Sequence, residues 1–225
     1  MHRLFLCIAI VFFFSCARSD SSKKEPQEIA AISWPVYRGD TQLSGVARDS
    51  LPDTLQLLWS FKTGYEIKSS PVIESGIIYL GSTDGYLYAL EVNNGHEIWR
   101  FETGDDVEAP PMLLDGVVYI GALNGIFYAL DAKTGNKIWS FAAEDQIYGS
   151  ANWVDAPHGT DKWVLFGSYD FHLYCLHAST GEKIWDIETN NYINGAPATD
   201  GEYIVFGGCD EQLHVVNAAD GRELV

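Results

Sequence analysis

The chain has 225 residues, of which 47% are hydrophobic and 13% aromatic, and this amount of apolar material excludes a wholly disordered chain. Its 14 basic and 31 acidic side chains give a formal net charge of -17, which repels phosphate backbones and excludes nucleic acid as a main partner. Four cysteines are too few for a disulfide scaffold, and 21 glycines set among β-branched and aromatic runs indicate an all-β protein.

The chain begins with a predicted export signal, residues 1–15. Arg3 precedes an unbroken apolar run at residues 4–14, which is shorter than the about 20 residues that a membrane-spanning helix needs. Cys16 follows a small residue at the end of this run. The pattern resembles the lipobox of bacterial lipoproteins, although Phe13 stands where that motif usually has leucine. An ordinary secretory signal cleaved near Ala17 is the alternative.

Residues 16–32 are expected to form a lipidated, flexible tether. The stretch at residues 17–28 is polar and lacks large apolar side chains. The resemblance to lipoproteins implies that a lipid on Cys16 attaches the protein to a membrane. Since Ala17, rather than aspartate, follows the cysteine, the sorting rule of those proteins implies the bacterial outer membrane. The pattern leaves the periplasmic and the cell-surface side both open.

From residue 33 onward the sequence repeats itself at a step of 40 residues. Trp59, Trp99 and Trp139 follow this step, and Trp185 comes 46 residues later because the third copy has a longer connection at residues 155–161. Each copy is predicted to hold four short strands, at residues 70–74, 77–82, 86–92 and 97–103 in the first copy. The Asp-Gly and Asn-Gly turns between them suit type I′ hairpins. Four antiparallel strands every about 40 residues is the period of a β-propeller blade.

A tryptophan motif recurs at the end of each copy. It reads ALEVNNGHEIW at residues 89–99, ALDAKTGNKIW at residues 129–139 and CLHASTGEKIW at residues 175–185. This resembles the tryptophan-docking motif of quinoprotein (PQQ-type) propellers, and the lead-in that starts at Trp34 resembles that of the BamB-type outer-membrane assembly lipoproteins. The resemblance covers residues 33–225. It implies that the following residues dock neighbouring blades: Trp59, Trp99, Trp139, Trp185, Gly95, Gly135 and Gly181.

The fourth copy stops at Val225, where the next tryptophan should stand. Residues 57–63 supply an unpaired outer strand ahead of the first full copy. We therefore expect about four blades, forming a partial propeller that is the N-terminal part of a seven- or eight-bladed one. The alternative is a closed four-bladed ring in which residues 57–63 pair with the fourth copy at residues 196–217.

The sequence offers no catalytic motif, since it lacks a Gly-rich phosphate loop, an HExxH helix and a GxSxG elbow. Quinoprotein dehydrogenases resemble the chain in the docking motif but also carry an adjacent cysteine pair and a calcium-binding acidic set. Cys175 and Cys209 are not adjacent, and we interpret them as free thiols rather than a disulfide. We expect no enzyme, no catalytic residue, no cofactor and no metal.

One rim of the propeller is predicted to be acidic. The connections between copies and the middle turns of each copy emerge on the same side. This candidate partner rim comprises Tyr65, Glu66, Asp84, Asp105, Asp106, Glu108, Glu144, Asp145, Tyr148, Asp170, Glu188, Tyr192, Asp210 and Glu211. Such a surface suits a basic protein partner or a cation, and ordinary solvated loop ends are the alternative.

The sequence thus predicts a non-catalytic, lipid-anchored propeller that mediates protein–protein interaction at the bacterial outer membrane. Its resemblance to BamB-type proteins implies that the partner is the outer-membrane β-barrel assembly machinery. The alternative is a ligand-binding or quinoprotein-like propeller domain of a longer periplasmic enzyme.

Overall fold

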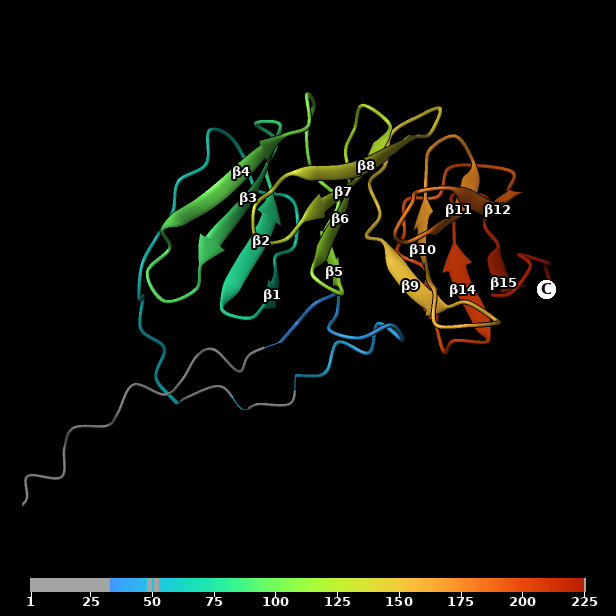
Figure 1. The fold of residues 1–225 in the computed structure, drawn as a ribbon, viewed down its shortest axis with the longest axis horizontal. Helices are drawn as coiled ribbons and strands as arrows, with labels where there is room; N and C mark the ends of the chain where they lie inside the picture. The colour runs from blue at the N-terminus through green and yellow to red at the C-terminus, as the bar shows by residue number, and fades with distance from the viewer. Residues whose placement is uncertain (1–32, 48–49, 51–52, 225) are drawn as a thin grey trace, which may run out of the picture.

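The computed structural model describes residues 33–47, 50 and 53–224. Regular secondary structure in these residues consists of 15 strands in four antiparallel sheets, which confirms the predicted blades (Figure 1). None of these residues forms a helix that is long and apolar enough to cross a bilayer. The predicted signal at residues 1–15, the lipid site at Cys16 and the tether at residues 16–32 lie outside the described residues.

Each blade takes its strands in chain order. Blade 1 holds β1 (Val72–Glu74), β2 (Ile77–Gly81), β3 (Tyr86–Glu91) and β4 (Glu97–Glu102). Blade 2 holds β5 (Met112–Leu114), β6 (Val117–Gly121), β7 (Ile126–Asp131) and β8 (Lys137–Ala142). Blade 3 holds β9 (Asn152–Asp155), β10 (Lys162–Gly167), β11 (His172–His177) and β12 (Lys183–Glu188). Blade 4 holds β13 (Ala198–Thr199), β14 (Tyr203–Gly207) and β15 (Leu213–Asn217).

The blades follow one another along an arc, so that blades 1 and 4 lie at opposite ends (Figure 1). Residues 57–63, predicted as an unpaired outer strand, join none of the four sheets and form no regular secondary structure. Leu57 is consequently 87% exposed. No backbone hydrogen bond within the described ranges joins residues 57–63 to β15, so the closed four-bladed ring is not formed.

The turns are only partly of the predicted type. Type I′ geometry needs positive φ at both central residues, and Ser75-Gly76 and Asp115-Gly116 have it. At Asp84-Gly85 only the glycine has positive φ, so the prediction was wrong there. The Asp84 carboxylate instead accepts a hydrogen bond from the Tyr86 N–H at 3.2 Å, which stabilises a turn that ends in one left-handed glycine.

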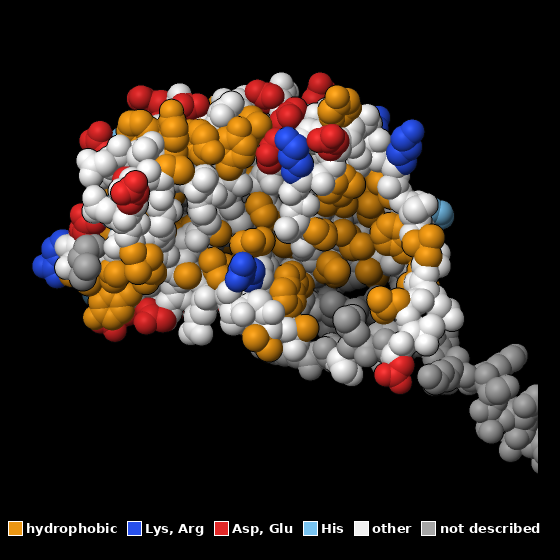
Figure 2. Space-filling view, turned by 180° about the vertical axis from the view of Figure 1, so that it is seen from behind, with side chains coloured by type: hydrophobic (Ala, Val, Ile, Leu, Met, Phe, Trp, Pro, Cys, Tyr) orange, Lys and Arg blue, Asp and Glu red, His pale blue; other side chains and the backbone are white. Residues whose placement is uncertain are grey.

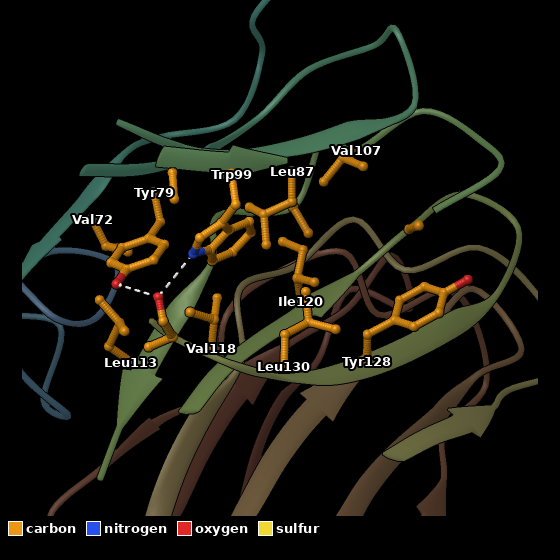
Figure 3. Packing of buried hydrophobic residues seen from close by; sticks show 14 residues of the cluster. Val72, Tyr79, Leu87, Trp99, Val107, Leu113, Val118, Ile120, Tyr128 and Leu130 are labelled. Atoms are coloured by element: carbon orange, nitrogen blue, oxygen red, sulfur yellow. Dashed lines mark hydrogen bonds between the residues drawn. The ribbon is translucent and has the colours of Figure 1, made fainter. Parts of the chain in front are cut away.

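Apolar side chains on both faces of each sheet form separate cores between the blades. Leu87 and Trp99 of blade 1 pack with Val118 and Leu130 of blade 2 (Figure 3). Between blades 2 and 3 the rings of Phe127 and Phe166 stack at 4.1 Å, and a third core lies between blades 3 and 4. Since a four-stranded sheet cannot bury both faces by itself, the blades stabilise one another.

The segment before blade 1 that contains Trp34, Pro35 and Thr41, here called the lead-in, makes hydrogen bonds to the first strand of every blade. The N–H groups of Ile73 in β1 and Leu113 in β5 donate to the Trp34 and Pro35 carbonyls at 3.0 and 2.7 Å. The Thr41 carbonyl accepts from Thr199 of β13 and from the Asn152 amide of β9, both at 2.8 Å. The lead-in therefore satisfies donors in all four blades and braces the arc (Figure 1, blue).

Candidate functional site

The recurring tryptophans each reach into the next blade. The indole Nε1 of Trp99 in β4 donates to the Ala132 carbonyl of blade 2 at 3.0 Å, and that of Trp139 in β8 donates to the Ala178 carbonyl at 2.9 Å. The remaining members of the set make the same bond: Trp59 to Val92 at 2.8 Å and Trp185 to Ala218 at 3.3 Å. A hydrogen bond and a ring that is buried in Trp99 and half-buried in the others thus join each pair of neighbours.

The glycines of the motif let these rings approach. Gly135 and Gly181 have φ of +71° and +74°, and a Cβ at either position would lie 2.7 Å from the ring of Trp99 or Trp139. Gly95 lies against Trp59 in the same way. Any side chain here would strain the backbone and displace the indole, which is the physical reason for the repeated glycine.

Two interfaces carry a second donor on the same carbonyl. The Tyr79 hydroxyl of β2 also donates to the Ala132 carbonyl, at 3.0 Å (Figure 3). The Tyr119 hydroxyl of β6 likewise donates to the Ala178 carbonyl beside Trp139, also at 3.0 Å. Burial raises the pKa of Tyr79 to about 12 and raises that of Tyr119 as well. Both phenols therefore remain protonated donors at neutral pH.

Buried side chains hold the connections that form the candidate partner rim. Val107, Ile147 and Ile193 are fully buried, and each packs against the glycine that ends the second strand of the preceding blade. Their N–H groups donate to the residue after that glycine, as Val107 does to the Ser82 carbonyl at 3.1 Å. The rim loops are thus fixed to the blades.

Three predicted rim residues face inward instead. The Asp84 carboxylate accepts from the Tyr88 hydroxyl at 2.7 Å and the Gly64 N–H at 2.6 Å. Burial by itself would raise the pKa of Asp84, but these hydrogen bonds outweigh it and hold the pKa below its usual value. Asp170 accepts from the Tyr174 hydroxyl at 2.7 Å.

Asp210 fills the equivalent place in blade 4. Its carboxylate lies 2.9 Å from Nε2 of His214, which also contacts Glu223 through Nδ1 at 2.6 Å. Burial opposes charge on His214, but the two carboxylates outweigh it and raise the pKa of the imidazole. Asp84, Asp170 and Asp210 therefore hold the middle turns together and present little carboxylate to a partner.

The other predicted rim residues do reach the surface. The exposed members are Tyr65, Glu66, Asp105, Glu144, Asp145, Glu188, Tyr192 and Glu211, and the half-buried ones are Asp106, Glu108 and Tyr148. Lys68 forms an ion pair with Glu108 at 2.7 Å. Acidic side chains interleave with hydrophobic ones along the edge from which the connections emerge (Figure 2).

Sequence reasoning missed two members of this surface. The rings of Tyr148 and Tyr169 have their centroids 4.5 Å apart, and those of Tyr169 and Tyr192 are 4.6 Å apart. Phe171 lies 5.3 Å from Tyr192. Tyr169 and Phe171 gave a signal in the sequence, since they depart from the Thr-Asp-Gly of the first middle turn.

The two described cysteines are free thiols. Cys175 is fully buried in the core between blades 3 and 4, opposite Trp185 in the ladder, and burial raises the pKa of its thiol well above the ordinary range. Cys209 is exposed on the middle turn of blade 4. Cys175 is thus a packing residue in the position that Ala89 and Ala129 hold in the earlier blades.

The fold and its docking sites define the chain as a β-propeller built from four-stranded blades. A family model described as outer membrane protein assembly factor BamB matches residues 44–152. A second, described as the β-propeller domain of glucose/ethanol/alcohol dehydrogenases, matches residues 102–224. The chain belongs to this family of PQQ-type propellers.

Solved structures share the fold at low sequence identity. BamB from Moraxella catarrhalis is 19% identical, with a TM-score of 0.63 over 73% of this chain and 54% of its own. Quinohemoprotein alcohol dehydrogenase from Comamonas testosteroni is 17% identical, with a TM-score of 0.69 over 86% of this chain and 40% of its own. The chain thus spans about half or less of their length. A comparison with curated proteins finds no match.

The match to a designed protein covers nearly the whole of that protein. The computationally designed Ika4 is 18% identical, with a TM-score of 0.61, and the match covers 73% of this chain and 99% of Ika4. Blades of this kind are therefore found in chains of very different length.

A quinone and a calcium ion go with the dehydrogenase members of the family, and the described residues do not fit them. Cys175 and Cys209 lie in different blades, one buried and one exposed, so they form no adjacent pair. Across the described ranges no group of three or more His, Cys, Asp or Glu side chains is arranged to hold a metal ion. These residues therefore give no basis for deriving quinone chemistry.

Proposed function

We propose that this protein is a non-catalytic propeller scaffold that docks a protein partner on its acidic rim at the bacterial outer membrane. Its role is BamB-like, in the assembly of outer-membrane proteins, and the partner is the β-barrel assembly machinery. The observation that carries the proposal is the match of the BamB family model over residues 44–152. That segment includes the connections with Asp105, Asp106, Glu144 and Asp145.

The mechanism is rigid display. The rim side chains lie on loops whose buried residues, such as Val107 and Ile147, lock them to the sheets. A partner that docks there orders few loops on binding, so little conformational entropy is lost. The exposed carboxylates steer a basic surface toward the rim and favour one orientation of it.

Attachment to the outer membrane is part of the same proposal. It has its support in the sequence pattern at residues 1–16, where a lipid on Cys16 would anchor the chain. Cells that express the wild type or Cys16→Ser can be labelled with a radioactive fatty acid and fractionated. We expect label and outer-membrane recovery for the wild type, and neither for the variant. Equal recovery of both proteins would contradict lipid anchoring.

The docking face can be tested with a photoreactive amino acid placed at single positions of the full gene product in cells. Asp105 and Asp145 sample the acidic rim, and Lys133 and Lys137 sample the opposite rim as matched controls. We expect crosslinks to a component of the barrel assembly machinery from the first pair only. Crosslinks from the opposite rim alone would contradict the proposed face.

An enzymatic role is the second candidate, since the dehydrogenase propeller model matches residues 102–224. The purified full chain can be incubated with pyrroloquinoline quinone and calcium, then assayed for reduction of a dye by ethanol or glucose. The scaffold proposal expects no reduction above that of protein-free cofactor. Saturable, substrate-dependent dye reduction would replace the scaffold with an enzyme.

A further inference from the structure

The rim over blades 3 and 4 carries a cluster of aromatic rings that pack on one another. Tyr148, Tyr169, Tyr192 and Phe171, here called the tyrosine ladder, come from two connections and one middle turn. Tyr169 lies between its two tyrosine neighbours, and Tyr192 remains 41% exposed. Tyrosines in such a rigid group give large contact area on binding at low entropic cost.

Phe171 occupies a backbone position that favours glycine. Its φ is +77°, whereas Gly85 and Gly125 hold the same place in blades 1 and 2 with φ of +84° and +77°. A left-handed conformation costs a bulky residue about 1–2 kcal/mol, and glycine avoids that cost. Phenylalanine therefore makes the middle turn of blade 3 less stable than glycine would at the same position.

The backbone at Phe171 does nothing that glycine could not do. The Phe171 carbonyl accepts from the N–H and the hydroxyl of Thr189, both at 2.8 Å. The Gly85 carbonyl accepts the same pair of bonds from Thr103, both at 2.9 Å. What phenylalanine adds is the ring, which is half-buried and packs against the exposed ring of Tyr192.

Carboxylates lie beside Tyr148, at one end of the ladder. Glu108 and Asp106 lie near Tyr148, whose pKa is raised first by burial and then by the negative charge of Glu108. Glu144 and Asp145 are exposed on the connection that leads to Tyr148. Lys68 pairs with Glu108 and offsets its charge, but the other three carboxylates leave negative charge in excess at this end of the ladder. This combination of aromatic rings and carboxylates suits a cation.

We propose that the tyrosine ladder binds an arginine-bearing segment of the protein partner. The guanidinium group lies flat on aromatic faces and forks toward carboxylates, which an ammonium group cannot do. Arginine side chains of the segment would stack on Tyr192 and Phe171 while their N–H groups reach the rim carboxylates. The inference rests on the proposed function in that a protein partner docks on this rim.

The test uses the full mature chain without its lipid and two fluorescent peptides. One peptide alternates arginine with serine, and the other has neutral citrulline at each arginine. Fluorescence anisotropy at physiological salt measures both affinities. We expect the wild type to bind the arginine peptide at least about fivefold more tightly than the citrulline peptide.

The decisive variant is Phe171→Gly, because it removes the ring and relieves the backbone without changing the charge. We expect it to bind the arginine peptide about fivefold more weakly than the wild type while its Tm stays equal or rises. Phe171→Tyr, which keeps the aromatic face, should bind like the wild type. Wild-type affinity in Phe171→Gly, or equal binding of both peptides by the wild type, would overturn the proposal.

If Phe171→Gly lowers the Tm, Phe171→Leu decides, since leucine keeps apolar packing but has no aromatic face. Weak binding by Phe171→Leu supports the proposal, and wild-type binding overturns it. The result is separable from the proposed function. If rim crosslinks form but the Phe171 variants bind the arginine peptide like the wild type, only the proposed arginine-binding site is overturned. If the ladder binds the arginine peptide but no rim crosslinks form, only the proposed role in assembly is overturned.

Discussion

The first and the last pair of blades solve the same packing problem with different means. Between blades 1 and 2 the Ala132 carbonyl accepts from both Tyr79 and Trp99. Between blades 3 and 4, among the residues that the structure describes, only Trp185 donates to the Ala218 carbonyl, at 3.3 Å, because Leu165 stands where the tyrosine would be. The repeat is thus most complete at the start of the arc.

The middle turns differ in the same direction. Blades 1 and 2 place glycine at the left-handed position, whereas blades 3 and 4 place Phe171 and Glu211 there. The last two blades therefore combine a weaker interface with strained turns, and the rim there also carries the stacked rings of Tyr148, Tyr169 and Tyr192. The comparison indicates that the blades with the most regular repeat contribute most to stability. The residues that break the repeat in blades 3 and 4 instead build the aromatic part of the rim.

The largest expected effect comes from removing a docking ring. Trp99→Ala should destabilise the protein by about 3–5 kcal/mol, since it opens a cavity and breaks an interblade hydrogen bond. Trp185→Ala should cost about 1 kcal/mol less, because that ring is less buried and its bond is longer. Urea denaturation of both variants measures the difference. Equal losses would remove the contrast between the two interfaces.

Substitution of a docking-motif glycine should have the next largest effect on stability. Gly135→Ala puts a methyl group into the Trp99 ring and should cost about 3 kcal/mol. Gly116→Ala is the matched control, since its φ is also positive at +80° but no atom lies within 4 Å of the new Cβ. It should lose only about 1 kcal/mol, by the same urea assay. Similar losses would show that backbone strain, not ring contact, sets the requirement.

Alkaline pH should weaken the interfaces that use tyrosine donors. Burial raises the pKa of Tyr79 to about 12, above the unfolded value of about 10. Because the pKa of Tyr79 is higher in the folded state, its protonated form contributes fully to stability below about pH 10. This contribution to the free energy of unfolding is lost as the pH rises toward about 12. Urea midpoints across this range, followed with tyrosinate absorbance, test it.

Tyr79→Phe serves as the control for that titration and removes one donor from the Ala132 carbonyl. It should cost about 1 kcal/mol at neutral pH, because Trp99 still satisfies that carbonyl. Its stability should also fall less steeply with pH than that of the wild type. An unchanged slope would exclude Tyr79 as a contributor.

The smallest effect concerns the strained turn of blade 4. Glu211 is exposed and has φ of +65°, so Glu211→Gly should stabilise the protein by about 0.5 kcal/mol. Thermal unfolding detects this as a small rise in Tm. A fall in Tm would show that the Glu211 side chain makes a contact that outweighs the strain.

The sequence by itself determined the blades, because each is built from local periodicity: alternating strands, turn glycines and a tryptophan at a fixed step. It also located the docking glycines, since the Gly and the Trp of one contact recur in every copy. It could not determine which rim residues face outward. Asp84 and Asp170 resemble solvated turn aspartates in the sequence, yet the hydroxyl of the tyrosine four residues further on donates to each carboxylate.

Only the tertiary structure decided what distant segments do together. Tyr148, Tyr169 and Tyr192 stack because two connections and a middle turn converge on one rim, and Thr41 serves blades 3 and 4 because the lead-in crosses their first strands. Residues 57–63 have strand-like residues but no strand, because a ladder needs a partner. Local patterns set local conformation, whereas such contacts depend on where the whole chain places its segments.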